Sequence, residues 1–464
     1  MGSRIITSLV TVKMALILIC AILISAQYSC KKFLDKKPDQ KLSTPTTVNQ
    51  LQGFLDNPSY MNTKCSEAGE IASDNYYLSD AIYLSLSKDR ERDAYLWKPG
   101  IFLGMSPTDW ANEYNVVYNA NLVLDNINNI SRDAINFIEW DNCKGSALFF
   151  RAKSFYEIAQ IWAKAYDSST AISELGIPLR FTSDFNIKST RSTIKETYSQ
   201  IIQDFSEAIP LLPNLPQHPF RPSKAAAYGF LARTYLCMRN YAMAKQSAEM
   251  CLQIKSDLID YNDLDSTLSY PFPDIPTLNP ENIMHSVCTP TNLNLFFVYG
   301  IVDSLLYKSY ATDDLRKPLF FSENADGSHY YRGSYNGDYA NYNGIATDEI
   351  YLIRAECNAR LGNPTLAIND LNTLLTKRWK VGTYVPFVAS NSFVALNLVL
   401  IERRKELINR MARFTDIKRL NNEGANITLK RVIQGQTYTL TPNDPKFALP
   451  IPDNVIELSG IKQN

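Results

Sequence analysis

Two stretches of this chain, residues 223–254 and 346–377, share one pattern of apolar, aromatic and small residues at helical spacing. This internal similarity constrains the fold more than any single motif does. In the first stretch, the small residues Ala232 and Ala244 would let two antiparallel helices approach closely. In the second, Gly362-Asn363-Pro364 supplies a turn, because Gly tolerates a left-handed cap and Pro opens the next helix. The pattern predicts pairs of antiparallel helices.

The spacing within both stretches is that of a tetratricopeptide repeat. The matching positions are Tyr228, Leu231, Ala232, Tyr235, Ala244, Ala248 and Cys251 in the first stretch, and Tyr351, Ala355, Asn358, Ala367, Leu371 and Leu374 in the second. A third unit, near residues 145–213, is split by a loop between its helices LFFRAKSFYEIAQIWAKA and STIKETYSQIIQDFSEAIPLLP. We predict a mainly α-helical fold on a tetratricopeptide-like scaffold.

The rest of the chain is not repetitive. Residues 56–110 and 256–345 are rich in Asn, Asp, Gly, Pro and Tyr and contain few long periodic stretches. They predict large loops, short helices and short hairpins inserted into the helical scaffold. Because binding residues often lie on loops that a rigid scaffold positions, we expect these segments to form a ligand face.

The beginning of the chain predicts an export signal. The apolar run Met14–Ile24 follows Lys13 and is too short to cross a bilayer, which takes about 20 residues. A short apolar run behind a basic flank is typical of a secretory signal. We expect residues 1–29 to be a lipoprotein signal and Cys30 to carry lipid, although Gln27 stands where such signals usually have Leu. Plain secretion, with Cys30 an ordinary thiol, is the alternative.

Charge and aromatic content narrow the classes of function. Without residues 1–29, which hold two basic residues and no acids, 45 basic residues face 47 acidic ones, a net charge of about −2. A nucleic-acid binder would carry a basic face, so this class is not expected. The 27 tyrosines suit surfaces that must be both apolar and hydrogen-bonding. We expect Trp110, Trp140 and Trp162, which stand on predicted helices, to lie in the core.

The cysteines after Cys30 give no metal-binding pattern. None of the six is spaced as CxxC, so a zinc site is not expected. Cys237, Cys251 and Cys357 stand at helical positions and predict small buried side chains. A Cys65–Cys143 disulfide is left open. So is calcium binding, because the oxygen ligands of that ion can come from scattered loops.

Catalytic motifs are absent from the sequence. It has no GxSxG, HExxH, phosphate-loop or GxGxxG motif, and its three histidines are isolated. We therefore expect a binding protein and not an enzyme, without a cofactor. The charged motif Glu402-Arg403-Arg404-x-Glu406, with Arg413 and Asp416, suggests a structural network of ion pairs that holds the terminal helix.

Five stretches in order resemble one family. They are CKKFLDKKP, RPSKAAAYGFLARTYLCMRNYAMA, GIATDEIYLIRAECNARLGNPTLAINDLNTLLTKR, IERRKELINRMARFTDIKRLN and FALPIPDNVIELSGIKQN. Together they resemble the SusD-like (RagB/SusD) outer-membrane nutrient-binding lipoproteins of Bacteroidetes, over a single domain from residue 30 to 464. Ile408–Met411 depart from the usual Ala-Phe-Glu-Gly type of sequence, which we expect to change local packing and not function.

The resemblance implies a function. Members of this family sit at the outer membrane over a SusC-like TonB-dependent transporter, capture an oligosaccharide or polysaccharide chain and help to deliver it. Some relatives handle peptides, so a peptide-capturing protein is the first alternative. A surface glycoside hydrolase, which needs two facing carboxyl groups, and a pure interaction scaffold are the others.

A sugar site needs flat aromatic rings with polar groups around them, and two stretches fit this description. The predicted ligand-binding residues are Asp74, Asn75, Tyr76, Tyr77, Tyr95 and Trp97 in the first stretch and Tyr331, Tyr335, Tyr339 and Tyr342 in the second. Trp97 is the strongest single candidate, because Trp offers the largest stacking surface. The alternative is that the tyrosines of the second stretch form a hairpin that packs on the helices.

Overall fold

The computed structural model describes residues 45–86, 89–98, 108–273, 279–288, 299–332 and 335–464. The described residues from Thr47 onward belong to one compact unit. The expected signal segment and Cys30 lie outside the described residues, so lipidation stays a prediction. No helix in the described ranges is both long and apolar enough to cross a membrane.

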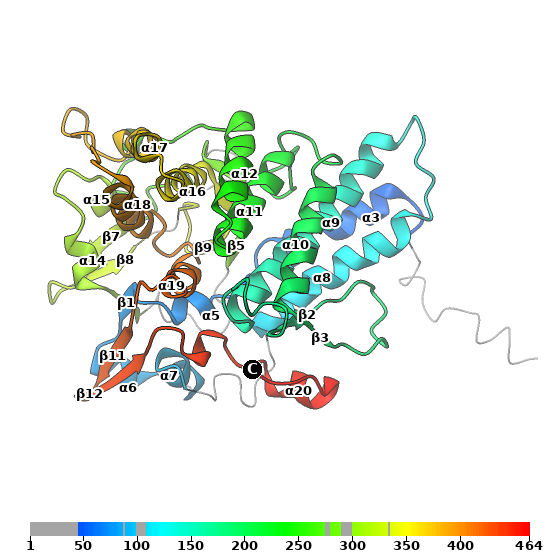
Figure 1. Ribbon diagram of the computed structural model, residues 1–464, viewed down its shortest axis with the longest axis horizontal. Helices are drawn as coiled ribbons and strands as arrows, with labels where there is room; N and C mark the ends of the chain where they lie inside the picture. The colour runs from blue at the N-terminus through cyan, green and yellow to red at the C-terminus, as the bar shows by residue number, and fades with distance from the viewer. Residues whose placement is uncertain (1–44, 87–88, 99–107, 274–278, 289–298, 333–334) are drawn as a thin grey trace, which may run out of the picture. The chain divides into compact units, whose positions relative to one another are not determined.

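Pairs of antiparallel helices form the scaffold (Figure 1), and the predicted mainly α-helical, tetratricopeptide-like fold is confirmed. The main helices are α3 (Val48–Leu55), α8 (Thr108–Ile127), α9 (Phe137–Trp162), α10 (Ile194–Ala208), α11 (Lys224–Cys237), α12 (Tyr241–Ile254), α16 (Thr347–Arg360), α17 (Pro364–Thr376) and α18 (Ser392–Glu406). Helix α9 packs between α8 and α10, α11 packs on α12, and α16 contacts α12, α17 and α18.

Local sequence explains where these helices begin and turn. Thr193 and Glu196 form a capping box at the start of α10, so that two backbone N–H groups of the first turn are satisfied. Between α16 and α17, Gly362 adopts a φ of +84°, which a side chain would disfavour, and Pro364 is the first residue of α17. Ala232 and Ala244 are fully buried, as the predicted close approach of α11 and α12 requires.

The described residues of the two irregular segments, up to the start of α8 and of α16, form short elements only. Between α3 and α8 these are α4 (Pro58–Met61), α5 (Ala68–Ile71), β1 (Tyr76–Tyr77), α6 (Asp80–Ser85) and α7 (Asp89–Tyr95). Between α12 and α16 they are η2 (Tyr261–Asp263), β4 (Asn282–Met284), β5 (Val287–Cys288), β6 (Ile301–Val302), α14 (Ser304–Lys308), α15 (Arg316–Phe320), β7 (Phe321–Glu323), β8 (His329–Tyr331), β9 (Asn341–Tyr342) and β10 (Ile345–Ala346). Each described sheet is a two-stranded antiparallel pair, and the pairs β1–β6, β4–β10 and β5–β9 bring distant parts of the chain together.

Two more elements of this kind, β2 (Leu175–Pro178) and β3 (Arg191–Thr193), pair inside the long loop between α9 and α10. The chain ends with α19 (Arg413–Asn421), the hairpin β11 (Leu429–Ile433) and β12 (Gln436–Leu440), η3 (Pro445–Phe447) and α20 (Asp453–Ser459). The core runs from α3 through the helix pairs to α16 and takes in Trp110, Trp140 and Trp162, as predicted.

Candidate functional site

Strand pairing decides which tyrosines of the irregular segments face outward. Strand β1 pairs with β6, β8 pairs with β7, and β6 also contacts β8. Since side chains alternate along a strand, Tyr76 and Tyr331 are buried, whereas their neighbours Tyr77 and Tyr330 are each 38% exposed. Tyr339 is also exposed. Three predicted or neighbouring tyrosines therefore have rings that a ligand can reach.

Trp97, the strongest candidate from the sequence, lies in the core. Its side chain is 2% exposed and packs in a cluster with Phe414 and Phe447. Its indole N–H donates to the carbonyl of Ala72 at 3.0 Å, so its polar group is satisfied inside the protein. The guanidinium of Arg431 lies 5.2 Å from the ring centre. In this structure the ring offers no face to a sugar.

Tyr95, Tyr76 and Asn75 of the same stretch are also structural. The hydroxyl of Tyr95 accepts from the backbone N–H of Leu78 at 2.8 Å. The hydroxyl of Tyr76 donates to a backbone carbonyl in α5, and the side-chain amide of Asn75 donates to Glu70 at 2.7 Å. All three side chains are fully or almost fully buried. Their polar groups hold the irregular segment together.

In the second stretch, Tyr335 and Tyr342 pack around a buried arginine. The guanidinium of Arg410 lies 3.9 Å from the ring centre of Tyr335 and 4.6 Å from that of Tyr342. The hydroxyl of Tyr335 donates to the carboxylate of Glu281, and that of Tyr342 donates to the carbonyl of Ile345 at 2.9 Å. Tyr335 and Tyr342 therefore pack inside the protein, which agrees with the alternative that the sequence left open.

Asp74 stands at the rim of this region and is partly exposed. Its carboxylate accepts two hydrogen bonds from Arg413, at 2.6 and 2.8 Å, and lies 3.4 Å from Arg404. Burial would raise the pKa of Asp74, but the hydrogen bonds and charge of Arg413 and the charge of Arg404 outweigh it and lower the pKa. Asp74 therefore stays anionic at the edge of this region.

The charged residues at the end of α18 form the predicted network. Glu406 pairs with Arg316 at 3.0 Å and with Arg378 at 2.7 Å, and all three side chains are fully buried. Arg316 also pairs with Asp314, and Arg378 pairs with Glu281. Burial tends to raise the pKa of Glu406, yet the two arginines lower it overall. The network joins α18 to the irregular segment before α16, which is a structural role.

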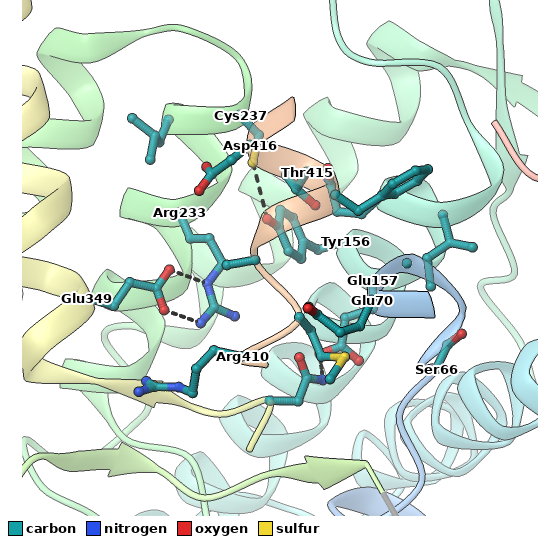
Figure 2. Close-up of a pocket in the computed structure, with 18 of the residues that line it drawn as sticks. Ser66, Glu70, Tyr156, Glu157, Arg233, Cys237, Glu349, Arg410, Thr415 and Asp416 are labelled. Carbon is teal, nitrogen blue, oxygen red and sulfur yellow. Dashed lines mark hydrogen bonds and ion pairs between the residues drawn. The ribbon is translucent and has the colours of Figure 1, made fainter. Parts of the chain in front are cut away.

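A polar cavity lies beside this network, at the junction of α9, α11, α16 and α19 (Figure 2). Arg233 donates to both oxygens of Glu349, at 2.9 and 2.5 Å, and Tyr156 Oη lies 3.2 Å from Cys237 Sγ. The cavity holds about 50 Å³, whereas sites for small molecules span about 300 Å³ or more. It is large enough for ordered water but not for a sugar.

Three buried polar atoms on the cavity wall need such water. In the described part of the chain, no partner is found for one oxygen each of Glu70 and Glu157 or for one nitrogen of Arg403. Buried groups of this kind are normally satisfied by protein or by ordered water. The small volume of the cavity therefore argues against it as a sugar site.

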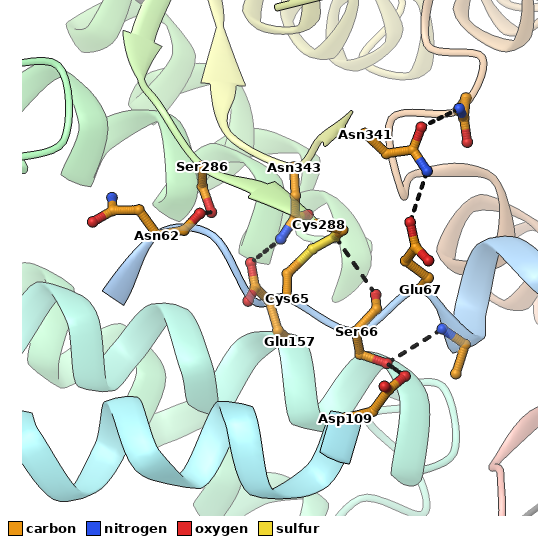
Figure 3. Close-up of a disulfide and its surroundings, with 12 residues drawn as sticks. Asn62, Cys65, Ser66, Glu67, Asp109, Glu157, Ser286, Cys288, Asn341 and Asn343 are labelled. Atoms are coloured by element: carbon orange, nitrogen blue, oxygen red, sulfur yellow. Dashed lines mark hydrogen bonds between the residues drawn. A yellow bond between two sulfur atoms is a disulfide. The ribbon is translucent and has the colours of Figure 1, made fainter. Parts of the chain in front are cut away.

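A disulfide joins the two irregular segments near this cavity (Figure 3). Cys65 is bonded to Cys288, and the open Cys65–Cys143 pairing is corrected, because Cys143 is a free, buried residue of α9. The backbone N–H of Val287 donates to the carbonyl of Asn62 at 2.8 Å, which brings the two cysteines side by side. The free residues Cys237, Cys251 and Cys357 are buried, as predicted.

Two buried carboxyls, Glu67 and Glu70, lie close in sequence to Cys65, and neither forms an ion pair with a cation of the described residues. Glu67 accepts one hydrogen bond from the amide of Asn341, at 2.8 Å (Figure 3). Glu70 accepts one from Asn75. Burial raises the pKa of Glu67 to about 8, with smaller contributions from the charges of Asp109 and Glu70. Burial likewise raises the pKa of Glu70 to about 7.

Sequence reasoning missed an open groove of about 560 Å³ between α3, α4 and α8. Its walls carry the exposed rings of Phe54, Tyr60 and Tyr118. A signal was present in the sequence, because Asn115, Tyr118 and Asn119 follow the i, i+3, i+4 spacing of one helix face. The spacing does not show that this face of α8 lies opposite α3 and α4, which is a tertiary contact.

Comparison with protein families decides the identity of the fold. A family model described as starch-binding associating with outer membrane matches residues 32–236, and a model of the SusD family matches residues 327–464. This chain belongs to the SusD family. The first match ends in α11, and the second begins inside the second irregular segment and runs to residue 464.

Solved structures show the same fold. A putative sugar binding protein from Bacteroides vulgatus superposes with a TM-score of 0.72 at 21% identity, covering 91% of this chain and 99% of that one. A SusD superfamily protein from Bacteroides thetaiotaomicron gives 0.71 at 19% identity, with 90% and 99% covered. A SusD-like carbohydrate binding protein from B. vulgatus gives 0.68 at 21%, with 89% and 97% covered. A comparison with curated proteins gives no match.

Proposed function

We propose that this SusD-family protein is a cell-surface lipoprotein that captures oligosaccharides and delivers them to a SusC-like TonB-dependent transporter. The observation that carries the proposal is the match to SusD-family models at both ends of the chain, one of them described as starch-binding at the outer membrane. Structures with the same fold include a putative sugar binding protein and a SusD-like carbohydrate binding protein. The protein binds its ligand without cleaving it.

The ligand contacts the exposed tyrosines of the irregular segments. Tyr77 and Tyr330 stand on strands that flank β6, and Tyr339 is the most exposed of the predicted tyrosines. A pyranose ring has an apolar face of C–H groups, which packs on a tyrosine ring, and a rim of hydroxyls. Asp74 and Arg404 supply charged partners for such hydroxyls at the edge of the site.

A binding screen tests this proposal. The protein, purified in a detergent without a sugar headgroup, is titrated by calorimetry with oligosaccharides of starch, xylan, mannan and levan. We expect one glycan class to bind, with loss of affinity in Tyr77→Ala or Tyr339→Ala and no released product. Phe393→Ala, which removes an exposed ring from α18, is the matched control. Binding of peptides only, or glycan cleavage, would overturn the proposal.

The lipid anchor is tested separately. Replacing Cys30 with Ala removes the only atom that could carry lipid at the expected cleavage junction. One acyl chain holds a protein on a membrane weakly and two or more hold it stably. We therefore expect Cys30→Ala to release the protein from the membrane fraction, and unchanged membrane association would contradict lipidation.

A further inference from the structure

The groove between α3, α4 and α8 has an unusual wall. It is lined by four amide side chains, three aromatic rings and one glycine: Gln50, Asn57, Asn115, Asn119, Phe54, Tyr60, Tyr118 and Gly53. Its volume of about 560 Å³ lies within the range of about 300–1,000 Å³ that is typical of small-molecule sites. No charged side chain belongs to this wall.

Both helices present these residues because their apolar residues point the other way. In α3, Leu51 and Leu55 are buried, so the opposite face turns Gly53 and Phe54 outward. In α8 the exposed face carries Asn115, Tyr118 and Asn119, while Val116, Val117 and Ala120 are buried. Pro58 starts α4 directly after Asn57 and places Tyr60 at the end of the groove. The wall is therefore built on packed helices.

Three of the four side-chain amides, those of the asparagines, are available to a ligand. Asn57 is the residue before α4, but its side chain makes no capping hydrogen bond. Among the hydrogen bonds of the described residues, none involves the side chains of Asn57, Asn115 or Asn119. An amide carries two donors and two acceptor positions, so these side chains can donate a hydrogen bond to a hydroxyl or accept one from it.

This composition selects one class of ligand. An apolar helix would bury the amides without partners, at a free-energy cost for each of them. A phosphate or carboxylate would find no cation in the wall. A sugar suits both parts, because its C–H face packs on Phe54, Tyr60 or Tyr118 and its hydroxyls pair with the amides.

The groove continues past Tyr118. This ring also lines a second depression of about 210 Å³, together with Arg180, Ser183 and the exposed ring of Phe185. One tyrosine thus belongs to two adjoining hollows. A ligand longer than one sugar unit can occupy both hollows while it contacts this ring.

We propose that the α3–α4–α8 groove is a second saccharide-binding site, which takes a stretch of an uncharged oligosaccharide chain. The inference rests on the proposed function for the identity of the ligand as a glycan. The groove shares no lining residue with the tyrosines Tyr77, Tyr330 and Tyr339. Two separate sites let one long glycan chain bind twice, which raises its overall affinity.

Gly53 allows a test that leaves the walls intact. A Cβ atom at this position would meet nothing within 4 Å, so a longer side chain fits the helix and projects into the groove. Gly53→Glu fills the groove, and Tyr60→Ala removes a ring from it. The controls are Asn369→Glu on the exposed face of α17 and Phe393→Ala on α18, both outside the two sites.

The measurement is the number of binding sites per protein for a short oligosaccharide. The oligosaccharide is taken from the glycan class that the wild type binds. We expect two sites in the wild type and in both controls, and one site in Gly53→Glu, in Tyr60→Ala and in Tyr77→Ala. For the parent polysaccharide we expect Gly53→Glu to lower the affinity about tenfold or more.

The other outcomes separate the two proposals. One site that is lost in Tyr77→Ala and kept in Gly53→Glu would overturn the groove and leave the proposed function standing. One site that is lost only in Gly53→Glu would support the groove and overturn the tyrosine site. A wild-type protein that binds none of the glycans would overturn both proposals. Circular dichroism of each variant confirms that it is folded.

Discussion

Glu67 is a buried carboxyl whose ionisation should affect stability. It follows the disulfide-bonded Cys65 by two residues, is almost fully buried, and accepts one hydrogen bond from Asn341. No cation forms an ion pair with it among the described residues, and its nearest charges are the carboxyls of Asp109 and Glu70. Burial raises its pKa from the usual 4.5 to about 8.

The sign and size of the effect follow from this shift. Between pH 4.5 and about 8 the native state keeps the proton of Glu67 and the unfolded state loses it, so stability falls as the pH rises. Each pH unit corresponds to about 1.4 kcal/mol, which gives a loss of about 3 kcal/mol at pH 7 and about 1 kcal/mol at pH 5. Glu67→Gln cannot ionise and keeps an acceptor for Asn341. We expect it to be more stable than the wild type by these amounts.

Urea unfolding at pH 5 and pH 7, followed by tryptophan fluorescence, measures both differences. Glu139→Gln is the control, because Glu139 is exposed on α9 and surface changes are usually within about 0.5 kcal/mol. The reasoning is refuted if Glu67→Gln is less stable than the wild type at pH 7. It is also refuted if the gain is the same at both pH values.

Three further predictions concern stability. Removing the disulfide with Cys65→Ser and Cys288→Ser, 223 residues apart, should cost up to about 5 kcal/mol in urea unfolding; equal midpoints would contradict this. Arg378→Met removes the cation that pairs with Glu281 and one of the two that pair with Glu406, and should cost about 3–5 kcal/mol, measured in the same way. Trp97→Ala should cost about 3–5 kcal/mol, whereas Tyr77→Ala should change stability by about 0.5 kcal/mol or less. A thermally robust Trp97→Ala protein would show that this ring is not part of the core.

The helix pairs could be predicted because their signals are local. Period, small residues and caps lie within a few turns of each other, as in the Thr193–Glu196 box and the turn at Gly362. The charged cluster of residues 402–416 could also be recognised as structural, since so many charges on one helix need partners. Its distant partners Arg316 and Arg378 could not be named from the sequence, because they come from separate segments.

Composition does not predict which tyrosines of the irregular segments are buried and which are exposed. Tyr76 and Tyr77 are adjacent and chemically identical, yet one is buried and the other exposed, because β1 pairs with β6, more than two hundred residues later in the chain. Tyr335 is buried because it covers the guanidinium of Arg410. The spacing of residues in the sequence does not predict this contact. The hydrogen bond from Trp97 to the carbonyl of Ala72 could not be predicted from the spacing of residues either.

The sequence by itself determined the helical-repeat scaffold and the resemblance to the SusD family. Both could be recognised because the helix period and the family motifs are contained in short runs of residues. Only the tertiary structure decided the Cys65–Cys288 pairing, the burial of Trp97 and the uncharged groove beside Tyr118. The physical reason is that exposure and pairing depend on which distant segments meet. In this protein, two-stranded pairs such as β1 with β6 bring distant segments into contact.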